Sequence, residues 1–169
     1  MWEYGEYLKE TGIATPPPKL DWENQVKHLS RPVVNVDWNE AVAYCRHFDC
    51  NLPTDTQWEF AARGKQSRTY PWEGAAEPGD PRANCKGALD SPSPVGIFPD
   101  GDTPEGVSDL LGNVWEWTGS ELEKGLYSVR GASFGVVQVV NLRAASRDWV
   151  GPDSRYDDLG FRCVREVIP

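Results

Sequence analysis

Two neighbouring stretches of the chain carry hydrophobic side chains every three or four residues, and each begins with a helix-capping signal. The first begins at Asp37, with Glu40 three positions later. The second begins at Thr54, with Gln57 three positions later, and a glycine, Gly64, follows its last apolar residue. These patterns predict two consecutive amphipathic helices whose aromatic residues pack in the core.

Weaker patterns surround this pair of helices. Residues 2–11 predict a short amphipathic helix that stops at Gly12, and residues 32–36 are extended. A buried turn is expected to lead into a strand within residues 109–118, and further strands are expected at 126–132, 139–145 and 160–167. The predicted fold class is α+β, with two or three helices on a small, mostly antiparallel sheet and much irregular structure.

Composition supports a single domain over residues 1–169. The chain has 8 Trp, 16 Gly and 14 Pro, a mixture typical of turns and irregular connections held by large aromatic side chains. Residues 65–104 are rich in Gly, Pro, Asp and Ser, yet aromatic residues recur there, so we expect ordered irregular structure rather than a linker.

The net charge of −9 argues against nucleic acid or an anionic membrane as the partner. No apolar run reaches the length of a transmembrane helix, so no membrane insertion is expected. We expect no signal peptide in the first ten residues, and no segment of the sequence indicates a cellular location.

The 4 cysteines have no CxxC spacing, which favours free buried thiols over a disulfide without excluding the latter. His47 lies between Cys45 and Cys50, an arrangement that raises the question of zinc. Cys45 and His47 would not share a helix face, and no fourth ligand is evident, so zinc is not expected.

The C-terminal part has an unusual organisation. Two segments, RGASF (130–134) and LGFRC (159–163), bracket short clusters that follow no single periodicity or charge pattern. A fixed frame that presents chemically unrelated clusters is typical of a recognition surface, and it is also typical of ordinary loops. The apolar run 136–140 is either exposed in this way or a strand buried on both faces, and residues 156–158 are either part of the surface or a solvated acidic loop.

Several long motifs occur in order: VNVDWNEAVAYCRHFDCNLPTDTQWEFAARG, LLGNVWEWT, RGASF, NLRAASR and LGFRC. From about Pro32 to the C-terminus the chain resembles the formylglycine-generating-enzyme family, a branch of the C-type lectin-like fold. That family's enzymes oxidise a sulfatase cysteine with two cysteines that hold copper. The matching positions here are Val136 and Asn141, which supply no thiolate, so neither catalysis nor bound copper is expected. Related sulfoxide synthases need a histidine cluster, and the chain has 2 histidines.

Another branch that the chain resembles comprises the variable proteins of diversity-generating retroelements, which display a hypervariable C-terminal surface on this fold. Their varied positions derive from asparagine codons altered at adenines, which reach Gly, Val, Asp, Ser and Tyr. All of the candidate variable positions in this chain hold one of those residue types: Gly135, Val136, Val137, Val139, Val140, Asp148, Val150, Gly151, Ser154, Tyr156, Asp157 and Asp158. Trp149 cannot be reached in this way and is expected to be a fixed contact residue.

This resemblance implies a non-enzymatic binding protein whose variable region covers about residues 130–163. Its partner would be a protein or another surface ligand of variable identity, and its place a virion or cell surface. Two alternatives stay open. One is an oxidase or sulfoxide synthase that uses unrecognised ligands, and the other is a structural domain with one fixed partner.

The family resemblance also implies a structural calcium ion, bound by the carboxylates of Asp109 and Glu116 and the main-chain oxygens of Gly112 and Val114. Alternatively, Glu116 pairs with an arginine such as Arg143 or Arg162, and no metal binds. The C-terminal part is dense in arginine, and we expect these side chains to tie loops to carbonyls and carboxylates rather than to contact a ligand.

Overall fold

The computed structural model describes residues 1–13, 21–76, 79–85, 89–136 and 142–166. Four α-helices come first: α1 (Trp2–Glu10), α2 (Trp22–Gln25), α3 (Trp38–His47) and α4 (Asp55–Arg63). The strands follow: β1 (Trp115–Glu121), β2 (Tyr127–Arg130), β3 (Arg147–Val150) and β4 (Leu159–Phe161). Two short 3-10 turns occupy Pro99–Gly101 and Glu123–Gly125. In these ranges no helix is both long and apolar enough to cross a lipid bilayer.

Both predicted capping boxes are confirmed. The Asp37 carboxylate accepts the backbone N–H of Glu40 at 2.9 Å, and the Glu40 carboxylate accepts the N–H of Asp37 at 3.1 Å. Thr54 and Gln57 exchange the same pair of bonds at the start of α4. These bonds satisfy backbone donors that a helix end leaves unpaired, which is why each helix begins at the residue after its cap. The N-terminal helix is also confirmed as α1.

The strands form one sheet in the order β3-β2-β1-β4. β1 and β2 are antiparallel, as are β2 and β3, whereas β4 runs parallel to β1 at the other edge. The predicted α+β class with a small, mostly antiparallel sheet and much irregular structure is therefore confirmed. The chain reaches the sheet only at Trp115, after a long irregular segment that Tyr70 and Trp72 help to anchor in the core.

Two predicted strands need correction. Within the predicted strand 139–145, residues 142–145 form turns, and 137–141 lie outside the described residues. Burial alternates here, because Leu142 and Ala144 point inward, but the N–H of Ala144 bonds to the carbonyl of Thr69 instead of a neighbouring strand. The strand is β3, which begins five residues later than Leu142. The last predicted strand is shorter than expected: it ends at Phe161, with one isolated bridge between Val164 and Asn51.

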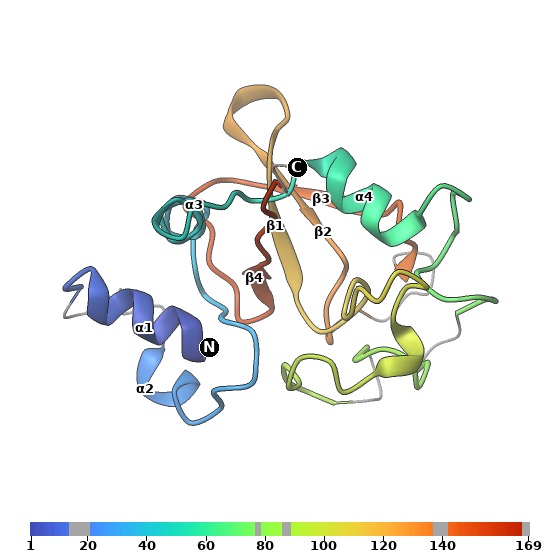
Figure 1. The fold of residues 1–169 in the computed structure, drawn as a ribbon, viewed down its shortest axis with the longest axis horizontal. Helices are drawn as coiled ribbons and strands as arrows, with labels where there is room; N and C mark the ends of the chain where they lie inside the picture. Colours follow the sequence, from blue (N-terminus) through green and yellow to red (C-terminus); the bar gives the residue numbers. More distant parts are fainter. Residues whose placement is uncertain (14–20, 77–78, 86–88, 137–141, 167–169) are drawn as a thin grey trace.

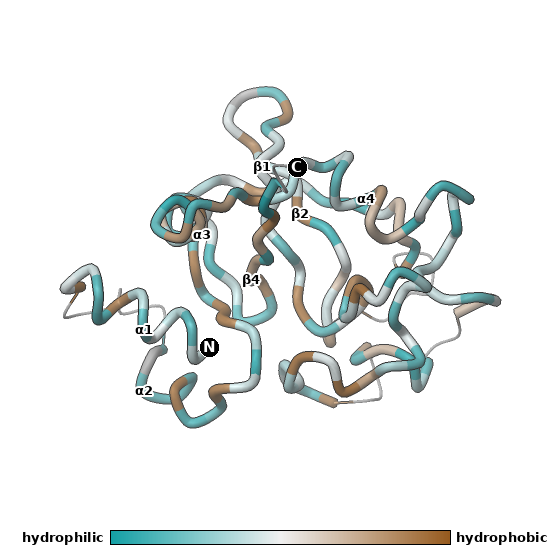
Figure 2. The backbone as a smooth tube through the Cα atoms, in the orientation of Figure 1, coloured by the Kyte–Doolittle hydropathy of each residue, from teal (hydrophilic) through white to brown (hydrophobic). Residues whose placement is uncertain are grey.

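α3 and α4 cover opposite faces of the sheet (Figure 1). Ala41 and Cys45 of α3 pack with Trp117 and Val129 on one face. On the other face, the indole N–H of Trp58 in α4 donates to Glu116 at 2.6 Å. Both helices carry hydrophobic and hydrophilic residues along their length, as amphipathic packing requires (Figure 2).

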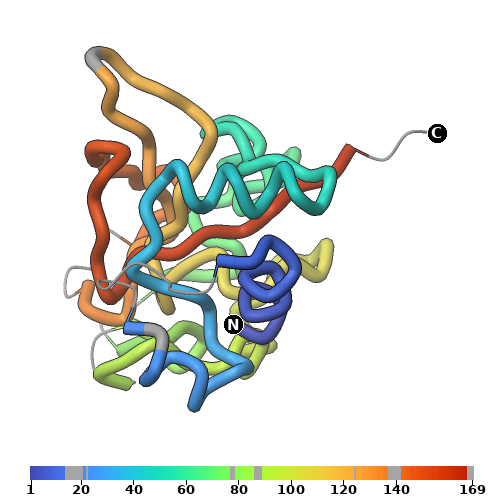
Figure 3. Tube along the Cα trace, turned by 90° about the vertical axis from the view of Figure 1, so that its left-hand side faces the viewer, coloured from blue at the N-terminus to red at the C-terminus, as the bar shows by residue number. Residues whose placement is uncertain are grey.

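The two ends of the described chain lie against α3. Tyr4 of α1 stacks on Tyr44 of α3, with ring centroids 5.5 Å apart, in a cluster that includes the buried Val33 and Val36. The segment after β4 runs beside α3 (Figure 3), where Cys163 meets Cys45. α3 is therefore held between the sheet, the N-terminal helix and the C-terminal segment.

Candidate functional site

A recess of about 180 Å³ opens on the α3 side of the sheet. Four of the predicted variable residues line it: Asp148, Val150, Tyr156 and Asp158. Its floor is made by Trp115, Val129 and Leu159. The structure therefore gathers residues from a strand and from a distant loop around one small concavity.

The strand register explains how the β3 residues reach the recess. Val129 of β2 lies opposite Asp148 of β3, and Trp115 of β1 lies opposite Leu159 of β4. Because side chains alternate between faces along a strand, Asp148 and Val150 point to the same side as Val129. β3 is an edge strand, so these two side chains lie at the rim of the sheet.

The loop from 151 to 158 supplies the other predicted residues of the recess, and Arg155 anchors it. Its guanidinium bonds to Glu40 at 2.5 and 2.8 Å, to Asp37 at 2.6 Å, and to the carbonyl of Asn35 at 2.9 Å. The hydrogen bonds that Arg155 donates to Glu40 raise the pKa of Arg155 above its ordinary value, and they outweigh burial, which acts in the opposite direction. The backbone N–H of Asn35 also bonds to the carbonyl of Tyr156 at 2.9 Å. The loop backbone is thus fixed, while the Tyr156 side chain remains 50% exposed.

Asp158 has a structural partner in addition to its place in the recess. Its carboxylate accepts the Ser133 hydroxyl at 2.6 Å, and its carbonyl accepts the N–H of Trp115 at 2.7 Å. Ser133 belongs to the RGASF frame. Asp158 is therefore more constrained than Asp157, which is exposed and lines a second recess of about 390 Å³ with Phe134.

The remaining predicted surface residues are less uniform. Gly135 is exposed, whereas Val136 is half-buried and packs against the cluster of Cys85, Ala132 and Leu142. Trp149 lies opposite Ser128 and so points to the other face of the sheet from the recess. The N–H of Ser154 closes a turn onto the carbonyl of Gly151 at 3.0 Å. The predicted positions Val137, Val139 and Val140, and the matching position Asn141, lie outside the described residues.

The predicted variable glycines and the frame glycine Gly131 differ in the space around them. A methyl group on Gly151 would meet only the Ser154 hydroxyl, at an ordinary 3.8 Å, and one on Gly135 only the Ser133 hydroxyl, at 3.7 Å. Gly131 of the frame has a φ of +94°, and a methyl group there would lie 3.2 Å from Trp58. Predicted variable glycines therefore have space for a side chain, and this frame glycine does not.

The arginines of the C-terminal part behave as predicted. Arg130 is fully buried and bonds to Asp55, to Glu59 and to two main-chain carbonyls. Burial raises the pKa of Asp55 and of Glu59, but the hydrogen bonds and charge of Arg130, together with those of Ser128 and Arg147 at Asp55 and of Arg63 at Glu59, outweigh it and hold each pKa below its usual value. Arg147 joins Asp55 from the surface at 2.9 Å. This network fastens α4 to β2 and to the start of β3.

The two carboxylates of the predicted calcium set already have partners within the protein. Both carboxylate oxygens of Glu116 accept Arg162, at 2.6 and 2.7 Å, and one of them also accepts Trp58. The Asp109 carboxylate accepts the N–H of Gly96 at 2.7 Å, and burial raises its pKa. Gly112 and Val114 are buried. The alternative pairing of Glu116 with Arg162 is the one observed, and calcium binding by the set stays a prediction.

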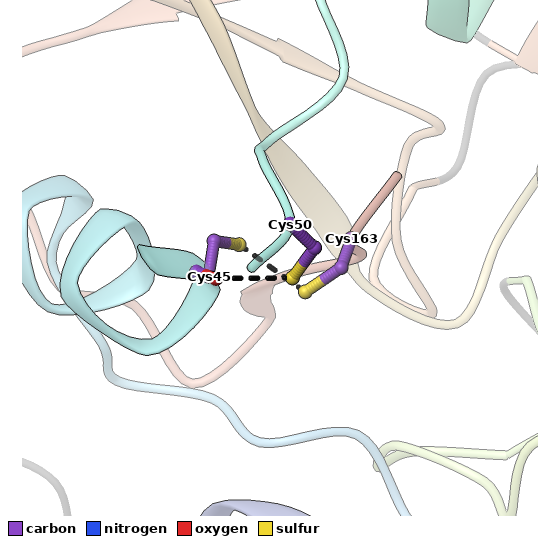
Figure 4. A group of neighbouring side chains, drawn as sticks. All are labelled: Cys45, Cys50 and Cys163. Atoms are coloured by element: carbon purple, nitrogen blue, oxygen red, sulfur yellow. Dashed lines mark hydrogen bonds between the residues drawn. The ribbon is translucent and has the colours of Figure 1, made fainter. Parts of the chain in front are cut away.

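The cysteines form a cluster that spacing alone did not indicate. The sulfur atoms of Cys45, Cys50 and Cys163 all lie within 4.8 Å of one another (Figure 4). All of the cysteines are free, as favoured, but Cys163 is exposed rather than buried. His47 turns away and bonds to Glu10 at 2.8 Å, so it does not join them. In the sequence, only the short spacing between Cys45 and Cys50 at a helix end indicates that cysteines lie close together. The third cysteine, Cys163, is 118 positions from Cys45.

Taken together, a mixed sheet between two capped helices, long irregular segments and an arginine-fastened loop over one sheet edge define a C-type lectin-like domain of the formylglycine-generating type. Residues 3–167 match the sulfatase-modifying factor enzyme 1-like domain. The chain belongs to this family.

The relatives include both a protein described as inactive and an enzyme. The chain is 37% identical to mouse inactive C-alpha-formylglycine-generating enzyme 2 over 88% of this chain and 56% of that protein. It is 36% identical to hercynine oxygenase of Mycobacterium tuberculosis over 80% of this chain and 37% of that protein. The chain thus spans about half the length or less of these relatives.

Solved structures agree on the fold. PvdO from Pseudomonas aeruginosa superposes with a TM-score of 0.71 at 28% identity, covering 82% of this chain and 63% of PvdO. Treponema denticola variable protein 1 superposes with a TM-score of 0.69 at 18% identity, covering 79% of this chain and 70% of that protein. The second likeness concerns the fold alone.

Proposed function

We propose that this chain is a non-enzymatic binding protein whose C-terminal face recognises a protein or another surface ligand. The observation that carries the proposal is the recess at the sheet edge, where four predicted variable side chains meet: Asp148, Val150, Tyr156 and Asp158. Their backbone is fixed by β3 and by Arg155, so the side chains of Asp148, Val150 and Tyr156 can differ without a change in the frame, whereas Asp158 also bonds to Ser133.

The enzyme alternatives lack their reactive groups. Val136 and Asn141 stand where the family's oxidases carry the two copper-binding cysteines. Among the described residues, the cluster of cysteines is the only group of three or more metal-binding side chains that converge, and it contains no histidine. The similarity to the mouse inactive protein is in keeping with this proposal, while the similarity to hercynine oxygenase makes a direct test of activity necessary.

The chemistry of the recess indicates what it would hold. Asp148 and Asp158 bring carboxylates to its wall, and the indole of Trp115 lies at its floor. A volume of about 180 Å³ is smaller than the few hundred Å³ of a typical small-molecule site. It suits one protruding cationic side chain of a partner, with Tyr156 as an aromatic contact beside it.

The proposal includes diversification of this face by a retroelement. The candidate positions all hold residue types reachable from adenine-altered asparagine codons, and the variable glycines have room for side chains. Exposed substitutions away from special features change stability by less than about 0.5 kcal/mol. A frame of this kind would therefore fold with many different surfaces.

A pair of libraries tests the proposal. One library randomises Asp148, Val150, Tyr156 and Asp157, and the matched control library randomises four framework residues of similar spread: Asp55, Val129, Arg130 and Leu159. We expect most members of the first library to be folded and to include binders to unrelated proteins, and few members of the second to fold. Similar losses of folding in both libraries would overturn the proposal.

The enzyme alternative is tested separately. We expect purified protein, with and without added copper or iron, to leave the cysteine of a sulfatase-derived peptide unoxidised, as judged by mass. Turnover of the peptide would establish an oxidase that uses ligands other than the family's cysteine pair.

A further inference from the structure

A recess of about 510 Å³ lies where α3, the start of α4 and the C-terminal segment meet, and none of the predicted variable residues that the structure describes lines it. Its lining includes Arg46 of α3, Gln57 of α4 and Arg165, which follows β4 (Figure 1). The volume lies within the range of about 300–1,000 Å³ that small-molecule sites occupy. We infer that this recess binds a small phosphomonoester with an apolar body, whose phosphate group Arg46 and Arg165 hold.

The two arginines of this recess have no carboxylate partner among the described residues, although most arginines there do. Ion pairs with Asp or Glu engage Arg63, Arg68, Arg82, Arg130, Arg147, Arg155 and Arg162. Arg31 and Arg143 are the other arginines that no described carboxylate engages. Acidic side chains outnumber basic ones in this chain by 26 to 17, so composition does not lead us to expect two cations without an acid in one recess.

The backbone brings these two arginines to the same recess. Asn51, in the connection from α3 to α4, exchanges two main-chain bonds with Val164, at 2.9 and 2.8 Å. Arg165 is the next residue, and its guanidinium donates to the carbonyl of Phe48, just past the end of α3. Arg46 lies in the last turn of that helix. A helix end and a distant segment of the chain thus place both guanidinium-bearing side chains in one lining.

The start of α4 adds neutral donors to the recess. The capping box of this helix uses the Thr54 hydroxyl oxygen and the Gln57 amide oxygen as acceptors. The Thr54 hydroxyl proton and the Gln57 amide N–H groups are therefore left for a ligand, and both residues line the recess. The N-terminal end of a helix also carries partial positive charge, which favours an anion. Glu166 is the only carboxylate among the described lining residues, so donors and positive charge predominate.

The apolar part of the recess is a rigid wall. Trp38 lines it together with Val42 and Leu52. The indole N–H of Trp38 donates to the carbonyl of Thr118 at 2.9 Å, and its ring stacks on Tyr127 with centroids 4.0 Å apart. A fixed indole offers contact area to a ring or a short aliphatic chain, and little side-chain freedom is lost when that ligand binds.

A phosphomonoester suits this combination better than a carboxylate does. At pH 7 it carries a charge of about −1.5 to −2 and three acceptor oxygens. Planar guanidinium groups bind phosphate through pairs of parallel N–H···O bonds. Two arginines and the neutral donors can therefore satisfy all of the phosphate oxygens. The rest of the volume holds the alcohol part of the ester, so inorganic phosphate alone should bind less tightly.

Isothermal titration calorimetry with phenyl phosphate, inorganic phosphate and benzoate tests the inference. We expect phenyl phosphate to bind at one site, about 10-fold or more tightly than either other probe. Arg46→Met and Arg165→Met should each weaken phenyl phosphate binding by about 10-fold or more, because each removes charge-assisted hydrogen bonds. The matched control Arg143→Met, which alters another exposed arginine, should bind as the unaltered protein does. Glu166→Gln should strengthen binding, because it removes the carboxylate from the lining.

Folding and pH provide the controls. All three arginines are exposed, so their variants should keep the melting temperature of the unaltered protein. Affinity should fall below about pH 6, where the phosphate group gains a proton. Trp38→Leu should reduce the advantage of phenyl phosphate over inorganic phosphate, and the arginine variants decide the matter if this variant does not fold.

Three results would overturn the inference. Unchanged affinity in Arg46→Met or Arg165→Met would show that these side chains do not hold the phosphate group. Equal weakening in Arg143→Met would show that phenyl phosphate is attracted by charge in general rather than bound in the recess. Benzoate bound as tightly as phenyl phosphate would show that the recess does not recognise phosphate.

Discussion

A matched pair of glycine substitutions examines the division between frame and variable surface. Gly131 lies in the RGASF frame with a φ of +94°, and an added methyl group would lie 3.2 Å from the Trp58 ring and 3.3 Å from the Leu110 carbonyl. Trp58 is 1% exposed and Leu110 is fully buried, so neither can move aside easily. Gly151 has no positive φ, and a methyl group there meets only the Ser154 hydroxyl, at 3.8 Å.

The expected costs follow from these contacts. A left-handed backbone costs an L-residue about 1–2 kcal/mol, and overpacking a core costs about 1–3 kcal/mol. Gly131→Ala should therefore lower the free energy of unfolding by about 2–5 kcal/mol. Gly151→Ala restricts the unfolded chain without strain in the folded one, so it should leave stability unchanged or raise it by about 0.4–1 kcal/mol.

Thermal and urea unfolding of both variants beside the unaltered protein provide the measurement. At about 2–4 °C per kcal/mol for a chain of this size, Gly131→Ala should lose roughly 4–20 °C in Tm. Gly151→Ala should change by no more than about 4 °C. Equal losses in the two variants would refute the idea that Gly151 belongs to a surface free to vary.

Three further results are expected. Arg130→Met should destabilise the protein by about 1–3 kcal/mol, because it removes the buried guanidinium that bonds to the half-buried carboxylates of Asp55 and Glu59 and leaves them only their surface partners Arg147 and Arg63. The exposed Arg147→Met should cost less than about 1 kcal/mol in the same urea titration. The pKa values of Asp55 and Glu59 are held below their unfolded values, so their contribution to the free energy of unfolding is present above about pH 4 and is lost as pH falls further. The difference in stability between Asp55→Asn and the unaltered protein should therefore shrink in acid. A constant difference from pH 3 to pH 7 would contradict this. Calcium binding by the predicted set is tested by adding calcium to chelator-treated protein: a Tm that rises with calcium concentration would establish the site, and an unchanged Tm would show that Arg162 keeps Glu116.

Local signals were sufficient where the structure depends on neighbouring residues. The caps Asp37 and Thr54 predict the starts of α3 and α4, because each capping box uses only residues three positions apart. Charge density in the C-terminal part predicts the role of its arginines, since a buried guanidinium needs several acceptors. Arg130 and Arg155 show that role.

Features that depend on distant partners were beyond such signals. β3 is formed by the segment RDWV, which has no strong alternation of apolar and polar residues. The turn at 142–145 does have this alternation, through the buried Leu142 and Ala144, and was therefore predicted as a strand. The thiol cluster joins residues 118 positions apart, so the spacing of cysteines along the chain does not reveal it. The recess likewise requires the register of β2 with β3, which no local pattern specifies.

The central claim is that the predicted variable residues at the recess and beside it vary while the frame does not. Deep sequencing of the coding region for residues 130–163 across the source population tests it most directly. The account predicts substitutions at Asp148, Val150, Tyr156 and Asp157 that trace to altered adenines, and none at Arg130, Gly131 or Leu159. A C-terminal part no more variable than residues 37–64 would contradict it, and the chain would then be a domain with one fixed partner.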